Sequence, residues 1–162
     1  MFSIGKDAFW REVFFSRSFI DRMYKEALGC RSVEIVAESG DLATGLSRRL
    51  RFVQSVDVPG PIRKIFGDTT TMEEDGRFDA ASGRWKYRMV PDKMAEKISI
   101  TGETWVEPVA GDDGKIARVV EIDFSVSMFG VGGIVEKFMA SQTEGSWERQ
   151  ARFIEQYLAE KR

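Results

Sequence analysis

A chain of 162 residues with 43% apolar residues can bury one sizeable core, which predicts a single domain spanning residues 1–162. The 24 basic and 26 acidic residues nearly cancel, so no overall field favours a nucleic-acid partner. The absence of histidine excludes Ser-His-Asp, Cys-His and histidine-metal chemistry, and a single cysteine, Cys30, cannot form an intramolecular disulfide. We therefore expect no metal and no cofactor.

The N-terminal residues lack the pattern of a targeting segment. Lys6 and Asp7 fall where a signal peptide needs an unbroken apolar run, and no later apolar stretch reaches the length of a membrane span. A lone cysteine also favours a reducing compartment. These features predict a cytoplasmic protein.

The first thirty residues predict two short helices. Apolar and aromatic residues between positions 9 and 14 recur at helical spacing, and Asp7 precedes them as a candidate cap. A second helix is predicted over residues 18–28, with Gly29 supplying its end.

From residue 33 onward the period of the apolar residues changes from helical to two, which predicts strands with one face inward. Turns are predicted at Asp75-Gly76 and Ser82-Gly83, and a hairpin at Gly111–Gly114. The predicted strands cover residues 33–37, 46–56, 69–74, 84–89, 98–106 and 120–128.

The last part of the chain, about residues 134–161, predicts one long amphipathic helix. Its apolar stripe comprises Ile134, Phe138, Met139, Trp147, Ala151, Ile154 and Leu158. Two short helices, about six strands and a long helix predict an α+β fold in which a curved antiparallel sheet wraps around the C-terminal helix.

The element order and several segments resemble the StART-like (helix-grip, SRPBCC) superfamily, and within it the DUF2505 family and the VASt sterol-transfer domains. The segments are Phe9-Trp10, Phe14-Phe15-Ser16, Pro61–Asp68 and Gly133–Phe138. The resemblance implies an apolar cavity between sheet and helix, with an apolar loop near its mouth that admits a lipid or sterol-like molecule. Members of the superfamily begin with a full strand, for which only Met1–Gly5 are available here, so the first strand is expected to be short or missing.

Several inward-facing residues are the candidate ligand site, because aromatic and methionine side chains give adaptable apolar contact. Arg48 is the candidate polar group, since an inward charge needs a partner. Alternatively, Arg48 lies on the surface and the other residues form an ordinary packed core. The full set is Leu46, Arg48, Leu50, Phe52, Trp85, Tyr87, Met89, Ile122, Phe124, Val126, Phe138 and Gln142.

The segment between Pro59 and Asp68 is the candidate gate, with Ile62, Ile65 and Phe66 at an apolar tip. Arg63 and Lys64 flank this tip, a composition that suits transient contact with a membrane surface. The alternative is a loop that only covers the core.

Three hypotheses for function follow. The first is binding, and transfer, of a hydrophobic small molecule that is lipid-like or sterol-like. The second is an enzyme of the cyclase or isomerase type, in which Arg48, Tyr87 or a buried glutamate polarises the bound molecule. The third is a ligand-free protein-interaction module. A binder is favoured over an enzyme because the carboxylates, including Glu73 and Glu74, show no catalytic spacing and are expected on a solvated face.

Overall fold

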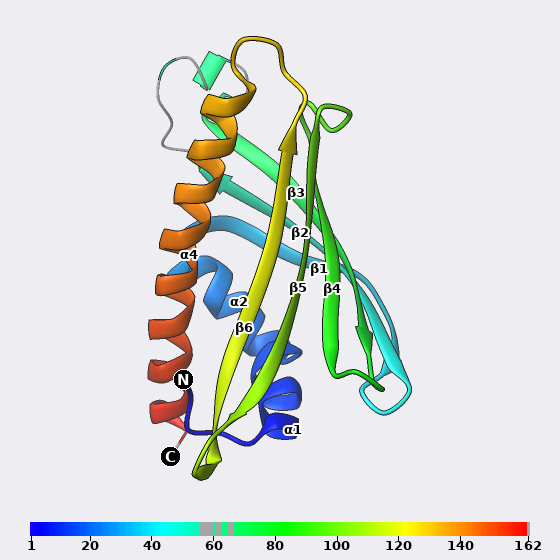
Figure 1. Cartoon of the computed structure of the whole chain (residues 1–162), viewed down its shortest axis with the longest axis vertical. Helices are drawn as coiled ribbons and strands as arrows, with labels where there is room; N and C mark the ends of the chain where they lie inside the picture. Colours follow the sequence, from blue (N-terminus) through cyan, green and yellow to red (C-terminus); the bar gives the residue numbers. More distant parts are fainter. Residues whose placement is uncertain (56–59, 61–62, 65–66, 162) are drawn as a thin grey trace.

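One antiparallel sheet dominates the computed structural model, which describes residues 1–55, 60, 63–64 and 67–161 (Figure 1). Its strand order is β1-β2-β3-β4-β5-β6, so every strand pairs with its neighbours in sequence. The strands are β1 (Cys30–Asp41), β2 (Gly45–Ser55), β3 (Thr69–Asp79), β4 (Arg84–Pro91), β5 (Ile98–Val109) and β6 (Asp112–Val126). The predicted antiparallel sheet is confirmed.

Two short helical segments precede the sheet. They are α1 (Lys6–Ala8), which continues into a π-helical stretch (Phe9–Phe14), and α2 (Arg17–Arg22), which continues into another (Met23–Ala27). The hydroxyl of Ser16 caps α2 by accepting a hydrogen bond from the Phe19 amide at 3.4 Å. The predicted cap at Asp7 is wrong, because this residue lies inside the first turn of α1 and Gly5 occupies the cap position.

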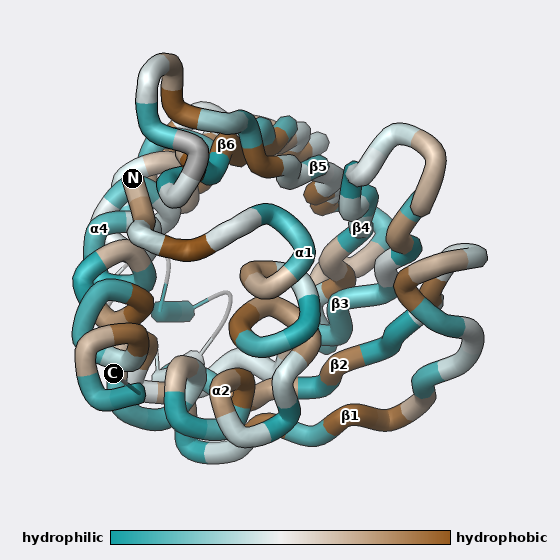
Figure 2. The backbone as a smooth tube through the Cα atoms, turned by 90° about the horizontal axis from the view of Figure 1, so that it is seen from below, coloured by the Kyte–Doolittle hydropathy of each residue, from teal (hydrophilic) through white to brown (hydrophobic). Residues whose placement is uncertain are grey.

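The chain ends in one long helix, α4 (Gly132–Glu160), which is 29 residues long and so extends about 40 Å. Figure 2, which looks along the long axis, shows the strands as an arc with α4 beside β6 and with α1 and α2 inside the arc. The sheet, α4 and the N-terminal helices together therefore enclose the interior, and the predicted α+β arrangement is confirmed.

Two local expectations are corrected by the structure. The turn predicted at Asp75-Gly76 is absent, since β3 runs through both residues to Asp79. Ile134 is 56% exposed and does not belong to the buried stripe of α4, whose first buried apolar side chain is the neighbouring Val135. Before α1, a single bridge joins Phe2 and Ile116, which agrees with the expectation that the first strand is short or missing.

The buried apolar side chains form two clusters. The first cluster joins the N-terminal helices, one end of the sheet and the last turns of α4: Phe2, Phe9, Trp10, Val13, Phe19, Leu46, Phe78, Trp85, Val106, Ile116, Phe153, Ile154 and Tyr157. The second joins the other end of the sheet and the first turns of α4: Ile20, Tyr24, Cys30, Leu50, Phe52, Met72, Ile98, Ile100 and Val135. We refer to these as the aromatic cluster and the mixed cluster.

Candidate functional site

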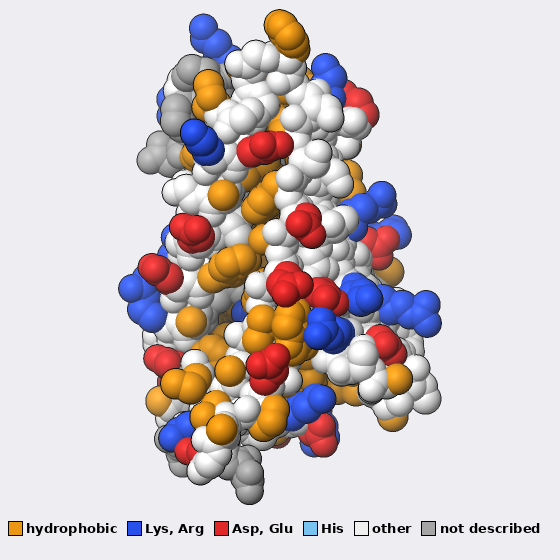
Figure 3. Space-filling model, in the orientation of Figure 1, with side chains coloured by type: hydrophobic (Ala, Val, Ile, Leu, Met, Phe, Trp, Pro, Cys, Tyr) orange, Lys and Arg blue, Asp and Glu red, His pale blue; other side chains and the backbone are white. Residues whose placement is uncertain are grey.

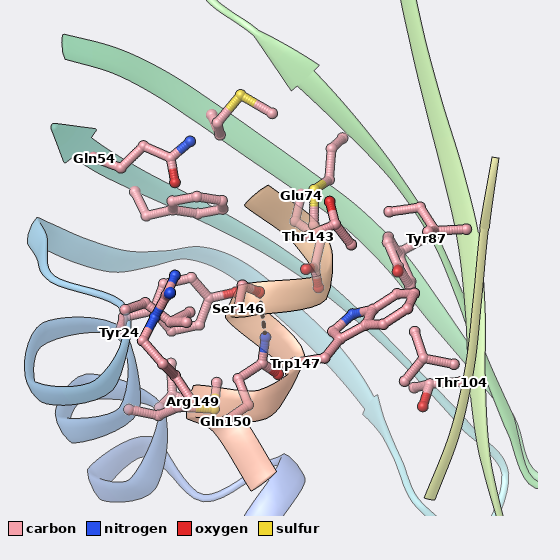
Figure 4. Close-up of a pocket in the computed structure, with 18 of the residues that line it drawn as sticks. Tyr24, Gln54, Glu74, Tyr87, Thr104, Thr143, Ser146, Trp147, Arg149 and Gln150 are labelled. Carbon is pink, nitrogen blue, oxygen red and sulfur yellow. Dashed lines mark hydrogen bonds between the residues drawn. The ribbon is translucent and has the colours of Figure 1, made fainter. Parts of the chain in front are cut away.

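A cavity of about 320 Å³ lies between the inner face of the sheet, α4 and the N-terminal helices. This volume is at the lower end of the range of ligand pockets, about 300–1,000 Å³. Figure 4 shows Trp147 reaching from α4 toward Tyr87 and Thr104 on the sheet, and Tyr24 reaching in from the N-terminal side. Side chains from all three layers therefore meet in the cavity.

Two strand glycines make room for aromatic rings on the floor of the cavity. A side chain at Gly76 would overlap the ring of Trp85, and a Cβ at Gly102 would lie 2.6 Å from the ring of Tyr87. The register places Gly76 and Gly102 on either side of Tyr87 in one row across the sheet. The two glycines therefore let both rings approach the backbone of the neighbouring strands closely, and both rings line the cavity.

One part of the cavity wall is apolar and flexible. It is lined by methionine, aromatic and branched side chains of the sheet, the second N-terminal helical segment and α4: Met23, Leu28, Phe52, Met72, Met89, Ile100, Ile122, Phe124, Phe138 and Met139. Methionine and aromatic side chains adapt to irregular apolar shapes. This wall suits an apolar molecule better than a polar one.

Arg48 is the most buried charged group of the cavity, with 4% of its surface exposed. It donates a hydrogen bond to the Phe14 carbonyl at 3.2 Å, and its guanidinium lies over the rings of Phe15 and Trp85 at 4.9 and 5.1 Å. Its Nε has no hydrogen-bond partner among the described residues. Burial lowers the pKa of Arg48, and the nearby Glu74 opposes that effect.

Arg118 enters the same cavity from β6. Its Nε donates to the Thr104 hydroxyl at 3.3 Å, and its Nη1 donates to the side-chain oxygen of Gln150 on α4 at 3.1 Å. Both partners are neutral. Burial lowers the pKa of Arg118, while Tyr87 and Glu74 raise it.

Glu74 is the one carboxylate among the described lining residues, which also include these two arginines, and it is 7% exposed. Burial raises the pKa of its carboxyl, and Arg48 partly offsets the rise. Burial also raises the pKa of Tyr87 to about 12 and that of Tyr24 well above its ordinary value. Both phenols therefore remain protonated donors near neutral pH.

The cavity opens where exposed polar residues join its lining. These are Ser55 at the end of β2 and Gln142 and Arg149 on α4. In Figure 3, hydrophobic side chains also show along the seam between α4 and β6, while acidic and basic side chains are interspersed elsewhere on that face.

Most of the ligand-site residues predicted from sequence line this cavity. They are Arg48, Phe52, Trp85, Tyr87, Met89, Ile122, Phe124, Phe138 and Gln142. Leu46 and Leu50 are buried but pack into the two apolar clusters, and Val126 packs against the mixed cluster; none of the three lines the cavity. Arg49 and Arg51, the neighbours of Arg48 and Leu50 on β2, are exposed and pair with Asp75 and Glu73.

Among the polar lining residues that the predicted site did not include, Glu74, Arg118 and Tyr24 bear most on its charge. Glu74 was expected on a solvated face, because the turn assigned to Asp75-Gly76 interrupted the alternation that places it beside Met72. Arg118 lies two residues before Val120 on β6, so alternation places both side chains on the inner face. The predicted strand began at residue 120 and therefore did not include Arg118. Tyr24 lies on a helical segment, and the strand alternation that identified inward-facing residues does not show which side of a helix contacts the sheet.

The predicted gate residues Ile62, Ile65 and Phe66 lie outside the described residues, so gating stays a prediction. Within the described part of the chain, no group of three or more cysteine, aspartate or glutamate side chains is placed to hold a metal ion. No helix of that part is both long and apolar enough to cross a membrane.

A six-stranded antiparallel sheet and a long helix around an internal cavity define an α+β protein with an enclosed pocket. The chain belongs to a family described as a protein of unknown function (DUF2505), whose model matches residues 7–158. No curated protein matches the sequence. The crystal structure of TTHA0849 from Thermus thermophilus is similar, with a TM-score of 0.53 and 18% identity over 85% of each chain, which shows a shared fold.

Proposed function

We propose that this protein binds a hydrophobic small molecule, lipid-like or sterol-like, in the internal cavity. The observation that carries the proposal is the cavity itself, about 320 Å³ lined by methionine, aromatic and branched side chains. Two glycines, Gly76 and Gly102, make room at its floor for the rings of Trp85 and Tyr87. The resemblance to the StART-like superfamily supports the same role.

Native mass spectrometry of protein purified from its own host tests this proposal. We expect a co-purified apolar molecule that is released under denaturing conditions. Met139→Trp, which fills the cavity from α4, should abolish co-purification, whereas Glu155→Trp at an exposed position of the same helix should not. An empty wild-type chain would favour the interaction-module hypothesis instead.

Contact with a membrane surface is a second part of the proposal, because a carrier must exchange its ligand somewhere. Phe129, in the loop between β6 and α4, is fully exposed, and Ile134 is 56% exposed nearby. The exposed Lys137 follows on α4, and the Lys97 carbonyl accepts a hydrogen bond from the Ser127 amide of this loop. Apolar and basic side chains together suit an anionic lipid surface.

Sedimentation with anionic vesicles tests this contact. Phe129→Ser should reduce the vesicle-bound fraction, and raised salt should reduce it further. Val36→Ser removes another exposed apolar side chain, on β1, and serves as the control that should change nothing. Equal binding of both variants would contradict the assignment.

An enzyme is the second candidate function, favoured by Glu74. A buried carboxyl with a raised pKa, in a cavity that also holds Tyr87 and Arg118, has the properties of a general acid or base. If the protein is a catalyst of the isomerase or cyclase type, the molecule that co-purifies with Glu74→Gln should be an isomer or precursor of the one that co-purifies with the wild type, and the two should differ in chromatographic retention and fragmentation even where their masses agree. Molecules identical in mass, retention and fragmentation would leave binding as the function.

A further inference from the structure

The cavity contains more positive charge than its own carboxylate balances. Arg48 and Arg118 line its inner part, the exposed Arg149 lines its opening, and Glu74 is the one acidic residue among the described lining residues. Neither of the two inner arginines forms an ion pair with a carboxylate anywhere in the described part of the chain. With Glu74 ionised, the lining of this inner region carries a surplus of one positive charge.

The two guanidinium groups are close to each other in the fold. Both lie against the ring of Phe14, at 5.5 Å for Arg48 and 5.9 Å for Arg118. Glu74 and Tyr24 each interact electrostatically with both of them. The surplus charge is thus local to the part of the cavity beside Phe14.

This arrangement is costly for an empty pocket. A buried guanidinium cannot neutralise itself by losing a proton, so it needs an acceptor or an anion to offset the loss of water. Arg48 has one neutral carbonyl acceptor and aromatic faces, and its buried Nε donates to no described residue. The unused donor, on a side chain that is 4% exposed, points to a missing acceptor.

We propose that the ligand of this cavity is an amphipathic carboxylic acid whose carboxylate binds Arg48 and Arg118 while its apolar body lies along the methionine-rich wall. The inference rests on the proposed function, since it names the ligand class of the same site. A carboxylate is an acceptor-only group with two oxygens, which matches two guanidinium donors. Its single charge balances the surplus, whereas a dianionic phosphate would exceed it and an alcohol would leave it uncompensated.

Displacement of Nile red, a neutral apolar dye, measures head-group preference without presupposing a charge. The competitors are oleic acid, oleyl alcohol and methyl oleate, which share one chain and differ in the head group. At a mildly alkaline pH, where the acid is ionised, we expect oleic acid to bind at least about tenfold more tightly than the other two.

Variants assign the preference to the two arginines. Arg48→Met and Arg118→Met should each lower the affinity for oleic acid about tenfold and leave that for the alcohol within about twofold. Arg49→Met, the outward neighbour on β2, is the matched control and should change neither. Glu74→Gln should act in the opposite direction and tighten binding of the acid alone, a gain that a merely structural role would not produce.

The outcomes separate the two levels of the proposal. Equal displacement by acid and alcohol, or equal losses for both in the arginine variants, would overturn the carboxylate assignment while the apolar cavity remains a binding site. Failure of the dye and of all three competitors to bind would overturn the proposed function and the carboxylate assignment together. If Arg48→Met does not fold, Arg118→Met and Glu74→Gln still decide the head-group assignment.

Discussion

The interior of this protein has two differently packed regions on one continuous sheet. The aromatic cluster is closed: Trp10, Phe15 and Phe78 have ring centroids 4.8 to 5.8 Å apart, and Trp10 and Phe78 are nearly inaccessible to solvent. The mixed cluster is open, because its outer members such as Phe124 and Phe138 are only partly buried and line the cavity. The same inner face therefore serves as packed core at one end and as binding surface at the other.

The difference arises from what covers the sheet. The N-terminal helices bring Phe9, Trp10 and Phe19 over the aromatic cluster, so large rings fill the space that the curved sheet leaves. Over the mixed cluster, α4 contributes Val135, Phe138 and Met139, and the last two line the cavity. Phe9, Phe19 and Trp85 of the aromatic cluster line the same cavity, so the packed rings form one of its walls.

The largest expected effect is the loss of a ring from the aromatic cluster. Phe78→Ala should lower the free energy of unfolding by about 3–5 kcal/mol, because the side chain is 4% exposed and its neighbours cannot collapse into the space. Urea titration measures the change. A loss below about 1 kcal/mol would show that this region is as loosely packed as the cavity.

An added methyl group tests the glycine floor. Gly76→Ala should lower the free energy of unfolding by about 1–3 kcal/mol, since the new Cβ would overlap the Trp85 ring. Gly133→Ala is the matched control, because no atom lies within 4 Å of a Cβ there and alanine favours a helix. Equal stability of both variants would mean that the Trp85 ring shifts without cost.

A smaller loss is expected for the same chemical change at the open end. Phe124→Ala should lower the free energy of unfolding by only about 1 kcal/mol, because the ring is partly buried and already borders empty volume. It should also reduce retention of the bound apolar molecule in native mass spectrometry. A loss as large as that of Phe78→Ala would contradict the contrast between the two regions.

Sequence pattern was sufficient for the sheet and for the inward face. Period-two alternation fixes the side of each strand, so Leu50, Trp85 and Ile100 are buried where the pattern places them. It also placed Arg48 inward, although burial of a charge runs against composition rules. These predictions depend only on local repetition along each strand.

The parts that could not be predicted depend on contacts between distant segments. The sequence indicated a turn at Gly76, because glycine after aspartate is typical of turns. The actual role of Gly76 is to accommodate the ring of Trp85, which belongs to another strand. Leu46 and Leu50 have the same parity as Arg48, yet the packing of the helices decides that they join the core and that Arg48 lines the cavity. The alternation of residues along a strand shows which face is inward, whereas the empty volume on that face depends on how distant segments pack against it.

The last prediction concerns Glu74, and it is a gain of stability rather than a loss. Burial raises the pKa of this carboxyl above its unfolded-state value, so the folded state loses stability as pH rises above about 4.3, where the unfolded chain ionises. Arg48 and Arg118 oppose the shift, and Tyr24 and Tyr87 stay neutral in this range.

Glu74→Gln holds the position neutral at every pH. The variant should therefore melt at a higher temperature than the wild type near neutral pH, and the two should converge in acid, where both side chains are uncharged. Glu73→Gln, on the outward face of β3, removes only an exposed ion pair with Arg51 and is the control. A lower melting temperature of Glu74→Gln at neutral pH would show that attraction by the two arginines outweighs burial, and would make Glu74 their resident counter-ion instead of a competitor of the bound acid.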